Sequence, residues 1–272
     1  MSIFICPVCG EKLEISGNTY LCSEHHCFDR SRSGYVNLLL SKNTGSIVHG
    51  DNKLMVQARR RFLGKGYYEP LCTALCNAVS EYIKGNTILD AGCGEGYYTT
   101  AINGKLHEQN IAASVYGIDI SKTAVEYAAK RCREAEFAVA SVFHIPVGNS
   151  SCDMLVTLFA PYCGEEFRRV LNDNGVMIMA IPSENHLWEL KKAVYDTPYK
   201  NEVRPYGLEG FRLEKQQRIT YDISLDSQED IDALFSMTPY YYRTGREQQE
   251  RLAHIGNLCT KVDFELLLYR KF

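Results

Sequence analysis

The chain lacks any apolar run long enough to cross a membrane, which takes roughly 20 residues in a helix. Its first residues also lack the basic segment and the apolar stretch of a secretory signal peptide. We therefore expect a protein that is neither membrane-spanning nor exported and that works in the reducing cytoplasm.

A strong charge of either sign is missing as well. The 30 Lys and Arg residues against 33 Asp and Glu leave a formal net charge of -3. This balance gives no overall attraction to nucleic acid, so a nucleic-acid function has to rest on local basic clusters. Internal repeats and low-complexity tracts are absent, and 272 residues suffice for one large domain with a small appendage or for two modest domains.

Cysteine, in contrast, is plentiful, with 11 residues. In a reducing compartment, closely spaced cysteines more often bind a metal ion than form disulfides. Six are scattered along the chain, and we expect them to be small buried hydrophobic residues: Cys72, Cys76, Cys132, Cys152, Cys163 and Cys259.

The N-terminal cysteines have the spacing of a zinc site. Cys6 and Cys9 are separated by two residues, as in a zinc knuckle, and Gly10 allows the tight turn that follows. The segment before Cys22 is long enough for a hairpin that brings the chain back to the first pair. This spacing disfavours the alternative of four unrelated cysteines. Because so small a segment has little core of its own, the metal would supply much of its folding energy.

The fourth ligand is open among three neighbouring residues. His25, His26 and Cys27 all follow Cys22 closely. We favour His26, which completes a Cys-x3-His half-site, and place Cys27 second. Four protein ligands leave no open coordination position, so the sequence predicts a structural zinc ion and not a catalytic one.

The chain divides into three stretches by composition. Residues 1–36 are rich in cysteine and turn residues, and residues 37–84 combine a polar linker with helical sequence. In residues 85–272, apolar strand-like runs alternate with helical patterns, which predicts an α/β domain with a mostly parallel sheet and helices on both faces. We expect strands over residues 86–90, 115–119, 136–140, 153–159, 175–181, 218–225 and 260–269. Helices are expected over residues 96–103, 122–132, 164–171, 186–195, 227–236 and 245–255.

A glycine-rich loop follows the first expected strand and reads Asp90-Ala91-Gly92-Cys93-Gly94-Glu95-Gly96. Glycines allow a sharp turn and a close approach of a cofactor to the backbone at the start of the next helix. Dinucleotide-binding folds carry a similar loop, but its spacing is Gly-x-Gly-x-x-Gly and it holds a pyrophosphate. S-adenosylmethionine has no pyrophosphate and carries an amino group and a sulfonium, which favour an acid such as Asp90 nearby.

Two later positions fit the same cofactor. Asp119 ends the second expected strand, where an acid can accept hydrogen bonds from both ribose hydroxyls. Ser141 follows the third strand, where a small polar side chain can lie at the edge of the adenine; a helix cap is the competing interpretation. The loop and the strand-end acid together predict a methyltransferase and outweigh the alternative that the glycines form a plain turn.

Several further motifs accompany the zinc cysteines and the loop. They are Gly34-Tyr35-Val36-Asn37-Leu38-Leu39, Gln57-Ala58-Arg59-Arg60-x-Phe62-Leu63, Gly66-x-Tyr68-x-Pro70-Leu71, Gly94-Glu95-Gly96-Tyr97-Tyr98 and His186-Leu187-x-Glu189-Leu190-Lys191. With these motifs, residues 86–270 resemble class I S-adenosylmethionine-dependent methyltransferases. Nearly end to end, the chain is similar to the RlmA-type 23S rRNA guanine-N1 methyltransferases.

The resemblance implies a Rossmann-like domain with a seven-stranded, mostly parallel sheet behind a small zinc-binding module. It also implies that the cofactor is bound by Tyr68, by Gly94, Glu95 and Gly96 of the loop, and by His186. From the residues alone, Tyr68 is a core aromatic and His186 begins a helix.

The implied reaction is methylation of N1 of a guanine in a hairpin loop of domain II of 23S rRNA. The resemblance further implies a homodimer whose zinc module, residues 1–36, grips the RNA by shape and phosphate contacts. Candidate phosphate contacts are basic residues of the first quarter of the chain: Arg30, Arg32, Lys42, Lys53, Arg59, Arg60, Arg61 and Lys65. Each alone is also explained as part of a solvated face. The linker at residues 43–49 is less basic than in many family members, which leaves the mode of RNA binding open.

The segment after the fourth strand narrows the methyl acceptor. Enzymes that methylate exocyclic amines carry Asp or Asn before a Pro-Pro-aromatic run, whereas this chain reads Leu158-Phe159-Ala160-Pro161-Tyr162. Cys163 does not match the nucleophile motif of cytosine-C5 enzymes. Phe159 and Tyr162 are candidates for stacking on an unstacked base, and no residue is assigned as a catalytic base.

Two other functions compete with this one. A small-molecule methyltransferase would keep the loop but would need no zinc module. A non-catalytic RNA-binding protein would keep the zinc module but would carry a damaged loop. Because the chain has both features, the sequence favours an rRNA methyltransferase.

Overall fold

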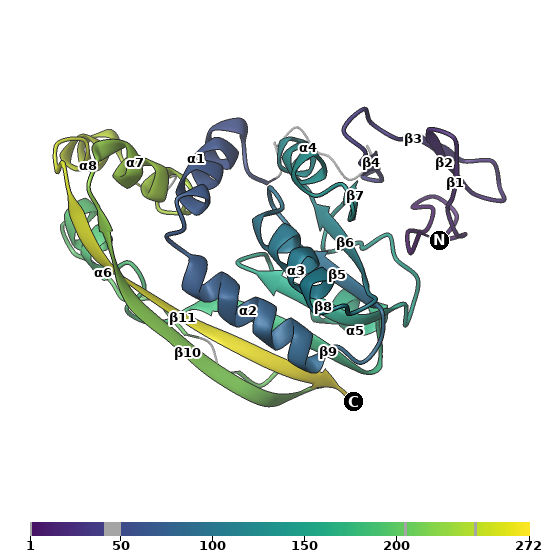
Figure 1. The fold of residues 1–272 in the computed structure, drawn as a ribbon. Coiled ribbons are helices and arrows are strands. Elements are labelled where there is room, and N and C mark those ends of the chain that lie inside the picture. Colours follow the sequence, from purple (N-terminus) through teal and green to yellow (C-terminus); the bar gives the residue numbers. More distant parts are fainter. Residues whose placement is uncertain (1, 41–49, 204–205, 242–243) are drawn as a thin grey trace.

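The computed structural model describes residues 2–40, 50–203, 206–241 and 244–272. Lys42 and the linker residues 43–49 lie outside this part of the chain. A small N-terminal sheet stands at one end of a larger α/β body (Figure 1). The described helices include none with the length and apolar character needed to span a bilayer.

The N-terminal module is a three-stranded antiparallel sheet in the order β1–β2–β3. Its strands are β1 (Glu14–Ser16), β2 (Thr19–Leu21) and β3 (Cys27–Asp29). Gly17, with φ +61°, lies in the two-residue turn between β1 and β2, where a left-handed conformation suits the twist of the two strands. Strands of three residues bury little on their own, so the module needs outside support.

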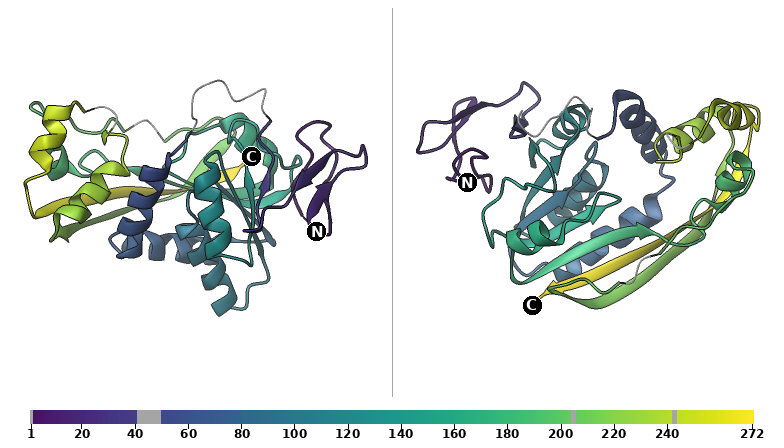
Figure 2. Two further views of the ribbon diagram at one scale, coloured as in Figure 1. Left: turned by 90° about the horizontal axis from the view of Figure 1, so that it is seen from above. Right: turned by 180° about the vertical axis from the view of Figure 1, so that it is seen from behind.

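Two aromatic side chains attach the module to the body. Phe4 and Tyr20 are fully buried. The Phe4 ring lies edge-on to Tyr116, with ring centroids 5.9 Å apart, and the Tyr20 hydroxyl donates to Glu136 at 3.2 Å. Both partners belong to strands of the large sheet. The module is therefore attached to one end of the body (Figure 2).

The body is built on an eight-stranded sheet in the order β10–β11–β9–β8–β5–β6–β7–β4. The strands are β4 (Val36–Asn37), β5 (Thr87–Ala91), β6 (Ser114–Asp119), β7 (Glu136–Val139), β8 (Cys152–Leu158), β9 (Leu171–Pro182), β10 (Phe211–Leu225) and β11 (Leu258–Lys271). Neighbouring strands from β4 to β9 are parallel, whereas β11 pairs antiparallel with β9 and β10. This is the mostly parallel sheet that the sequence predicts.

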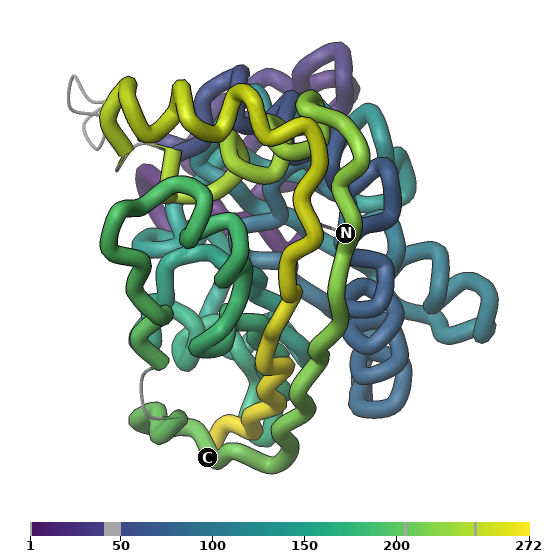
Figure 3. Tube along the Cα trace, turned by 90° about the vertical axis from the view of Figure 1, so that its left-hand side faces the viewer, coloured from purple at the N-terminus to yellow at the C-terminus, as the bar shows by residue number. Residues whose placement is uncertain are grey.

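Two strands differ from the expected boundaries. β4 adds an eighth strand, because Val36 and Asn37 pair with the outer edge of β7. β10 begins at Phe211 and not at residue 218, and it runs beside β11 along its length (Figure 3). Its residues between Phe211 and Ile219 are exposed at the edge of the sheet, so they lack the apolar alternation that marks a half-buried strand.

Eight helices of the described chain surround this sheet. They are α1 (Lys53–Gly64), α2 (Glu69–Tyr82), α3 (Tyr97–Glu108), α4 (Lys122–Arg131), α5 (Gly164–Val170), α6 (Trp188–Val194), α7 (Gln228–Ser236) and α8 (Arg246–Leu252). The side chains of Asn52 and Ser121 accept hydrogen bonds from the first turns of α1 and α4, which fixes where these helices begin.

Alternation along the strands gives the sheet two apolar faces. Ile88 of β5 packs in a cluster with residues of α2, α3 and α4, while the next residue, Leu89, packs in a second cluster with α5 and the N-terminal module. The carboxyl ends of β5 to β8 meet at one edge, and α1 lies near it between α4 and α7 (Figure 1). In open α/β sheets, ligands bind at this edge.

Candidate cofactor site and metal centre

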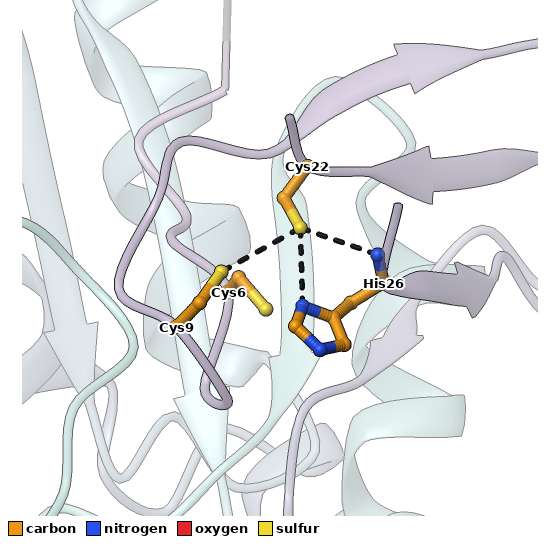
Figure 4. A group of neighbouring side chains, drawn as sticks. All are labelled: Cys6, Cys9, Cys22 and His26. Atoms are coloured by element: carbon orange, nitrogen blue, oxygen red, sulfur yellow. Dashed lines mark hydrogen bonds between the residues drawn. The ribbon is translucent and has the colours of Figure 1, made fainter. Parts of the chain in front are cut away.

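Four side chains of the N-terminal module converge on one point. The sulfur atoms of Cys6, Cys9 and Cys22 and a ring nitrogen of His26 all lie within 4.8 Å of one another (Figure 4). The Cys22 sulfur is 3.6 Å from that of Cys9 and 3.4 Å from His26 Nδ1. A tetrahedral zinc ion with bonds of about 2.0–2.3 Å needs ligand atoms at such separations. Three thiols and one imidazole are therefore a donor set that fits structural zinc.

The backbone positions these ligands through two tight turns. Gly10, with φ +80°, donates its N–H to the carbonyl of Cys6 at 2.9 Å, which closes the turn after Cys9. His26 donates its backbone N–H to the Cys22 sulfur at 3.3 Å. Burial opposes ionisation of the Cys22 thiol, but hydrogen bonds from His26 lower its pKa to about 7. The thiolate is the form that binds zinc.

The two other candidates for the fourth ligand point elsewhere. His25 is exposed, has a left-handed backbone with φ +60°, and donates its N–H to the Cys22 carbonyl. The exposed Cys27 thiol donates to the His25 carbonyl at 3.6 Å. The structure therefore groups His26, and neither neighbour, with the three cysteines.

The glycine-rich loop links β5 to α3, and its backbone conformation requires glycine at two positions. Gly92 has φ +89°, and a Cβ there would lie 2.4 Å from the Cβ of Ala160. Gly96 has φ +82°, and a Cβ there would lie 2.8 Å from the backbone of Ala128 in α4. Both positions are closed to larger residues, so the loop stays narrow and leaves its backbone open to a ligand.

Two acids flank this loop. Asp119, at the end of β6, accepts from the N–H of Gly94 at 2.9 Å and from that of Ser121 at 2.8 Å. Asp90, at the end of β5, is buried and accepts from the Thr99 hydroxyl at 2.6 Å. Burial raises the pKa of Asp90 to about 7, the Thr99 hydrogen bond lowers it, and the charge of Asp119 adds to the rise.

Glu95 is held differently from these acids. Its carboxylate is 1% exposed and pairs with the guanidinium of Arg131 in α4 at 3.1 Å. Burial still raises the pKa of Glu95 above its ordinary value, and Arg131 opposes that rise. The side chain is thereby engaged with α4, so the loop at this position offers its backbone.

Tyr68 and His186 lie side by side although they are far apart in sequence. The Tyr68 hydroxyl is 3.4 Å from His186 Nε2, and His186 Nδ1 accepts from the N–H of Asp263 at 3.2 Å. Burial lowers the pKa of His186 to about 3, so the ring is neutral at physiological pH. With Nδ1 as acceptor, Nε2 carries the proton and donates it to the Tyr68 oxygen. The hydroxyl hydrogen of Tyr68 is then available to a further acceptor.

Aromatic packing holds this pair in place. The ring of Phe264 lies 4.3 Å from that of His186 and 5.0 Å from that of Tyr68, measured between centroids. His186 does not begin a helix as expected, because Leu187 has a left-handed φ of +56° and α6 starts only at Trp188.

Ser141 follows β7 and lines a cavity of about 380 Å³ between the N-terminal module and the body. Its hydroxyl accepts from the N–H of Phe143 at 3.2 Å, and the residues after it form a turn. The helix-cap interpretation of Ser141 is therefore wrong, because no helix begins there.

Most of the basic residues expected to contact RNA make contacts with other groups of the protein. Arg61 and Lys65 form ion pairs with Asp230 of α7 at 3.5 and 2.6 Å. Arg60 stacks on the ring of Tyr127 at 3.9 Å, and Arg59 pairs with Asp51. In the N-terminal module, Arg30 donates to the carbonyl of Gly34 at 3.0 Å. Arg32 and Lys53 are exposed. The basic residues of α1 and the residue just after it thus mainly connect α1 to neighbouring parts of the body.

Two aromatic residues are exposed after the carboxyl end of β8. Phe159 is 47% exposed and Tyr162 is 39% exposed. Phe159 has φ +59°, which is strained for an aromatic residue, and its ring lies 5.1 Å from that of Phe264. The backbone thus holds a large, half-exposed ring against Phe264, the residue that also packs on Tyr68 and His186.

Comparisons with known proteins agree with this architecture. A family model described as a methyltransferase domain matches residues 83–236, and one described as RlmA, N-terminal, matches residues 4–46. A Bacillus subtilis protein named putative 23S rRNA (guanine-N(1)-)-methyltransferase YxjB is 31% identical over 281 residues, which cover 99% of this chain and 98% of that protein. A Streptomyces fradiae 23S rRNA (guanine(748)-N(1))-methyltransferase is 33% identical over 193 residues, 70% of this chain and 66% of that one.

The solved structure of YcgJ from Bacillus subtilis shares the fold alone. It is 15% identical, with a TM-score of 0.50, and the match covers 75% of this chain and 99% of that one. The end-to-end relative and the N-terminal family model are more specific, since both extend over the N-terminal module. The chain thus belongs to the RlmA-type 23S rRNA (guanine-N1)-methyltransferases, S-adenosylmethionine-dependent enzymes with an N-terminal zinc ribbon.

Proposed function

We propose that the protein methylates N1 of a guanine in a hairpin loop of domain II of 23S rRNA, with S-adenosylmethionine as methyl donor. The observation that carries this proposal is that one chain combines a zinc ribbon with an intact cofactor loop. Relatives named as 23S rRNA guanine-N1 methyltransferases support the choice of substrate. Such a substrate also places the enzyme in the cytoplasm.

The cofactor would lie along the loop at the carboxyl edge of the sheet. In this proposal Asp119 accepts hydrogen bonds from the ribose hydroxyls, and the side chain of Ser141 lies at the adenine edge. Asp90 would stabilise the positively charged amino and sulfonium groups. The backbone follows the cofactor at Gly92, Gly94, Glu95 and Gly96, and Tyr68 with His186 closes the methionine end.

Catalysis in this proposal consists mainly of positioning. S-adenosylmethionine supplies a sulfonium methyl group that is open to in-line attack by a ring nitrogen. The half-exposed ring of Phe159 would stack on the unstacked guanine, and Tyr162 would flank it. The strained backbone at Phe159 supports this role, since strain is kept where surrounding structure holds a functional geometry.

The zinc ribbon would bind the RNA and not the methyl donor. Cys6, Cys9, Cys22 and His26 would hold the zinc ion with four protein ligands, which would leave the metal no open position for chemistry. Because Arg59, Arg61 and Lys65 are already paired with acids of this chain, we assign the phosphate contacts to other exposed residues, such as Arg32 and Lys53. We further propose that the enzyme works as a homodimer, which light scattering of the purified protein would test.

The test is methylation of 23S rRNA from cells that lack the homologous gene. The enzyme is incubated with this rRNA and methyl-labelled S-adenosylmethionine, and the product is mapped by primer extension. We expect label in the rRNA and one new stop at a domain II guanine, because N1 methylation blocks base pairing. Label without a stop in domain II would overturn the substrate assignment. The absence of label, with an enzyme that contains zinc and binds S-adenosylmethionine, would overturn it as well.

A further inference from the structure

Arg59 reaches the cofactor loop from a different element. It lies on α1, and its Nη1 atom would stand 3.9 Å from a Cβ built on Gly94, at the middle of the loop. The guanidinium pairs with Asp51 and donates to the carbonyl of Met237 at 3.3 Å. The side chain is 27% exposed. A residue expected on the RNA-facing side is therefore turned toward the loop.

The charges around the loop call for a cation at this place. Three carboxyl groups lie there, those of Asp90, Asp119 and Glu95. Burial lowers the pKa of Arg59, while the charges of Asp119 and Glu95 oppose that fall. A guanidinium is protonated at any physiological pH. The nearby Arg131 is already paired with Glu95. Arg59 is the cation that stands beside Gly94, so an anionic group of a ligand at the middle of the loop would be stabilised there.

Two tyrosine hydroxyls stand close to the same guanidinium. Both Tyr68 and Tyr98 lie near enough for their hydroxyl groups to affect the pKa of Arg59. The hydroxyl of Tyr98 is buried and has no hydrogen-bond partner in the part of the chain that the structure describes. The Tyr68 oxygen accepts from His186, which leaves its own hydrogen to be donated. A buried hydroxyl without a partner is costly, so a ligand atom is expected to satisfy it.

We propose that Arg59, together with the hydroxyl of Tyr98, binds the α-carboxylate of the cofactor's methionine moiety. A guanidinium offers five N–H donors in a planar fork, and two of them are used by Asp51 and Met237. A carboxylate offers only acceptors and matches a cluster of donors. The two positive groups of the cofactor complement the acids, while its one negative group needs the cation.

This role also explains why α1 lies near the loop. Ser121, just after the ribose-binding position, donates its hydroxyl to the carbonyl of Asp51 at 2.7 Å. The N-terminal end of α1 and the guanidinium of Arg59 thus approach the two ends of the cofactor site. Binding of the carboxylate would join α1 to the loop. The inference concerns the methyl donor and holds whichever RNA is methylated.

The experiment compares two ligands that differ only in the carboxylate. S-adenosylmethionine and decarboxylated S-adenosylmethionine are titrated into the zinc-loaded full-length protein by calorimetry. The variants are Arg59→Met, Tyr98→Phe and the control Arg61→Met, which removes an arginine on the same helix that pairs with α7. We expect wild type and the control to prefer the carboxylate form by about 10- to 100-fold. Arg59→Met should abolish this preference, and Tyr98→Phe should reduce it.

Several outcomes would overturn the proposal. A wild-type protein that binds both ligands equally would do so, as would an Arg59→Met variant that keeps the wild-type preference. If Arg59→Met loses affinity for rRNA but still prefers S-adenosylmethionine over the decarboxylated form, Arg59 binds an RNA phosphate and not the carboxylate. Binding of the decarboxylated ligand reports that the variant is folded. If Arg59→Met is unstable, Arg59→Lys replaces it, because lysine keeps the charge but lacks the planar fork of donors. Its ratio of affinities for the two ligands should be smaller than that of wild type but greater than one.

Discussion

The zinc ribbon and the cofactor site hold their shapes by opposite means. The ribbon has strands of three residues, leaves Ile15 45% exposed, and buries Phe4 and Tyr20 largely against the body. The cofactor loop rests on an eight-stranded, mostly parallel sheet packed on both faces. The ribbon therefore depends on four ligands and a metal, while the loop depends on backbone geometry that glycines permit. Damage to one region should spare the other.

The largest expected effect is removal of a zinc ligand. Cys22→Ser should release the zinc ion and unfold the ribbon, since a structural zinc contributes on the order of 10 kcal/mol to so small a module. Zinc content measured by atomic emission should fall to near zero. Affinity for S-adenosylhomocysteine should stay within about twofold of wild type, because the loop lies in the other region.

Cys27→Ser is the matched control for this change. Cys27 is exposed one residue after His26 and lies outside the ligand group. It should keep full zinc content. Loss of zinc in Cys27→Ser, or loss of cofactor binding in Cys22→Ser, would show that the two regions are not separate in the way described.

The pH dependence of Asp90 gives the next effect. Burial raises its pKa to about 7 in the folded protein, above its unfolded value of 3.8. A raised pKa means that the protonated form is favoured on folding, so this contribution to stability is present below pH 4 and lost as pH rises through 7. Asp90→Asn should therefore be more stable than wild type by up to about 4 kcal/mol above pH 7 and similar at pH 4.

Urea unfolding of the zinc-loaded protein without cofactor at pH 4, 6 and 8 measures this difference. Zinc content is measured at each pH, so that unfolding of the ribbon through loss of zinc is distinguished from unfolding of the body. A stability difference between wild type and Asp90→Asn that does not grow with pH would contradict the burial of an acidic group at this position.

Asp119 tests the loop side of the comparison. The Asp119 carboxylate accepts hydrogen bonds from the backbone N–H groups of Gly94 and Ser121. Asp119→Asn removes the charge and one of the two acceptor oxygens. We expect affinity for S-adenosylhomocysteine to fall by about 10- to 100-fold, with zinc content unchanged. The control Asp173→Asn alters an acid that is 92% exposed and should leave affinity unchanged. Calorimetry that finds both variants alike would remove Asp119 from the cofactor site.

Phe159 tests the proposed stacking on the guanine. Phe159→Ala should lower the rate of rRNA methylation by about tenfold, since stacking on a base is worth roughly 1–3 kcal/mol. Phe159→Tyr keeps a ring and should stay close to wild type. Affinity for S-adenosylhomocysteine should not change in either variant. Equal rates for wild type and Phe159→Ala in single-turnover assays would exclude the stacking role.

The zinc ligands and the cofactor loop could both be predicted from short stretches of sequence. Ligand spacing is local, so Cys6, Cys9 and Cys22 could be identified directly, and only the choice among His25, His26 and Cys27 needed geometry. The loop and Asp119 were predictable for the same reason, because a strand that ends in an acid is a local pattern. The sheet order then brings these two strand ends together.

Contacts between distant segments could not be read in this way. Tyr68 meets His186 across 118 positions, and Arg59 reaches Gly94 from a helix whose basic residues look like a solvated face. A charge pattern does not say which partner a side chain has, so Arg61 and Lys65 were expected at RNA although they pair with α7. β4 was missed because two residues are too few to show a period.

The separation of roles is tested most directly by primer extension on 23S rRNA with wild type and Cys22→Ser at equal occupancy by S-adenosylmethionine. The wild-type enzyme should produce a stop at one domain II guanine, and the variant should produce none although it binds the methyl donor as well. A stop of the same strength with both proteins would contradict the claim that the zinc ribbon selects the RNA while the loop holds the cofactor.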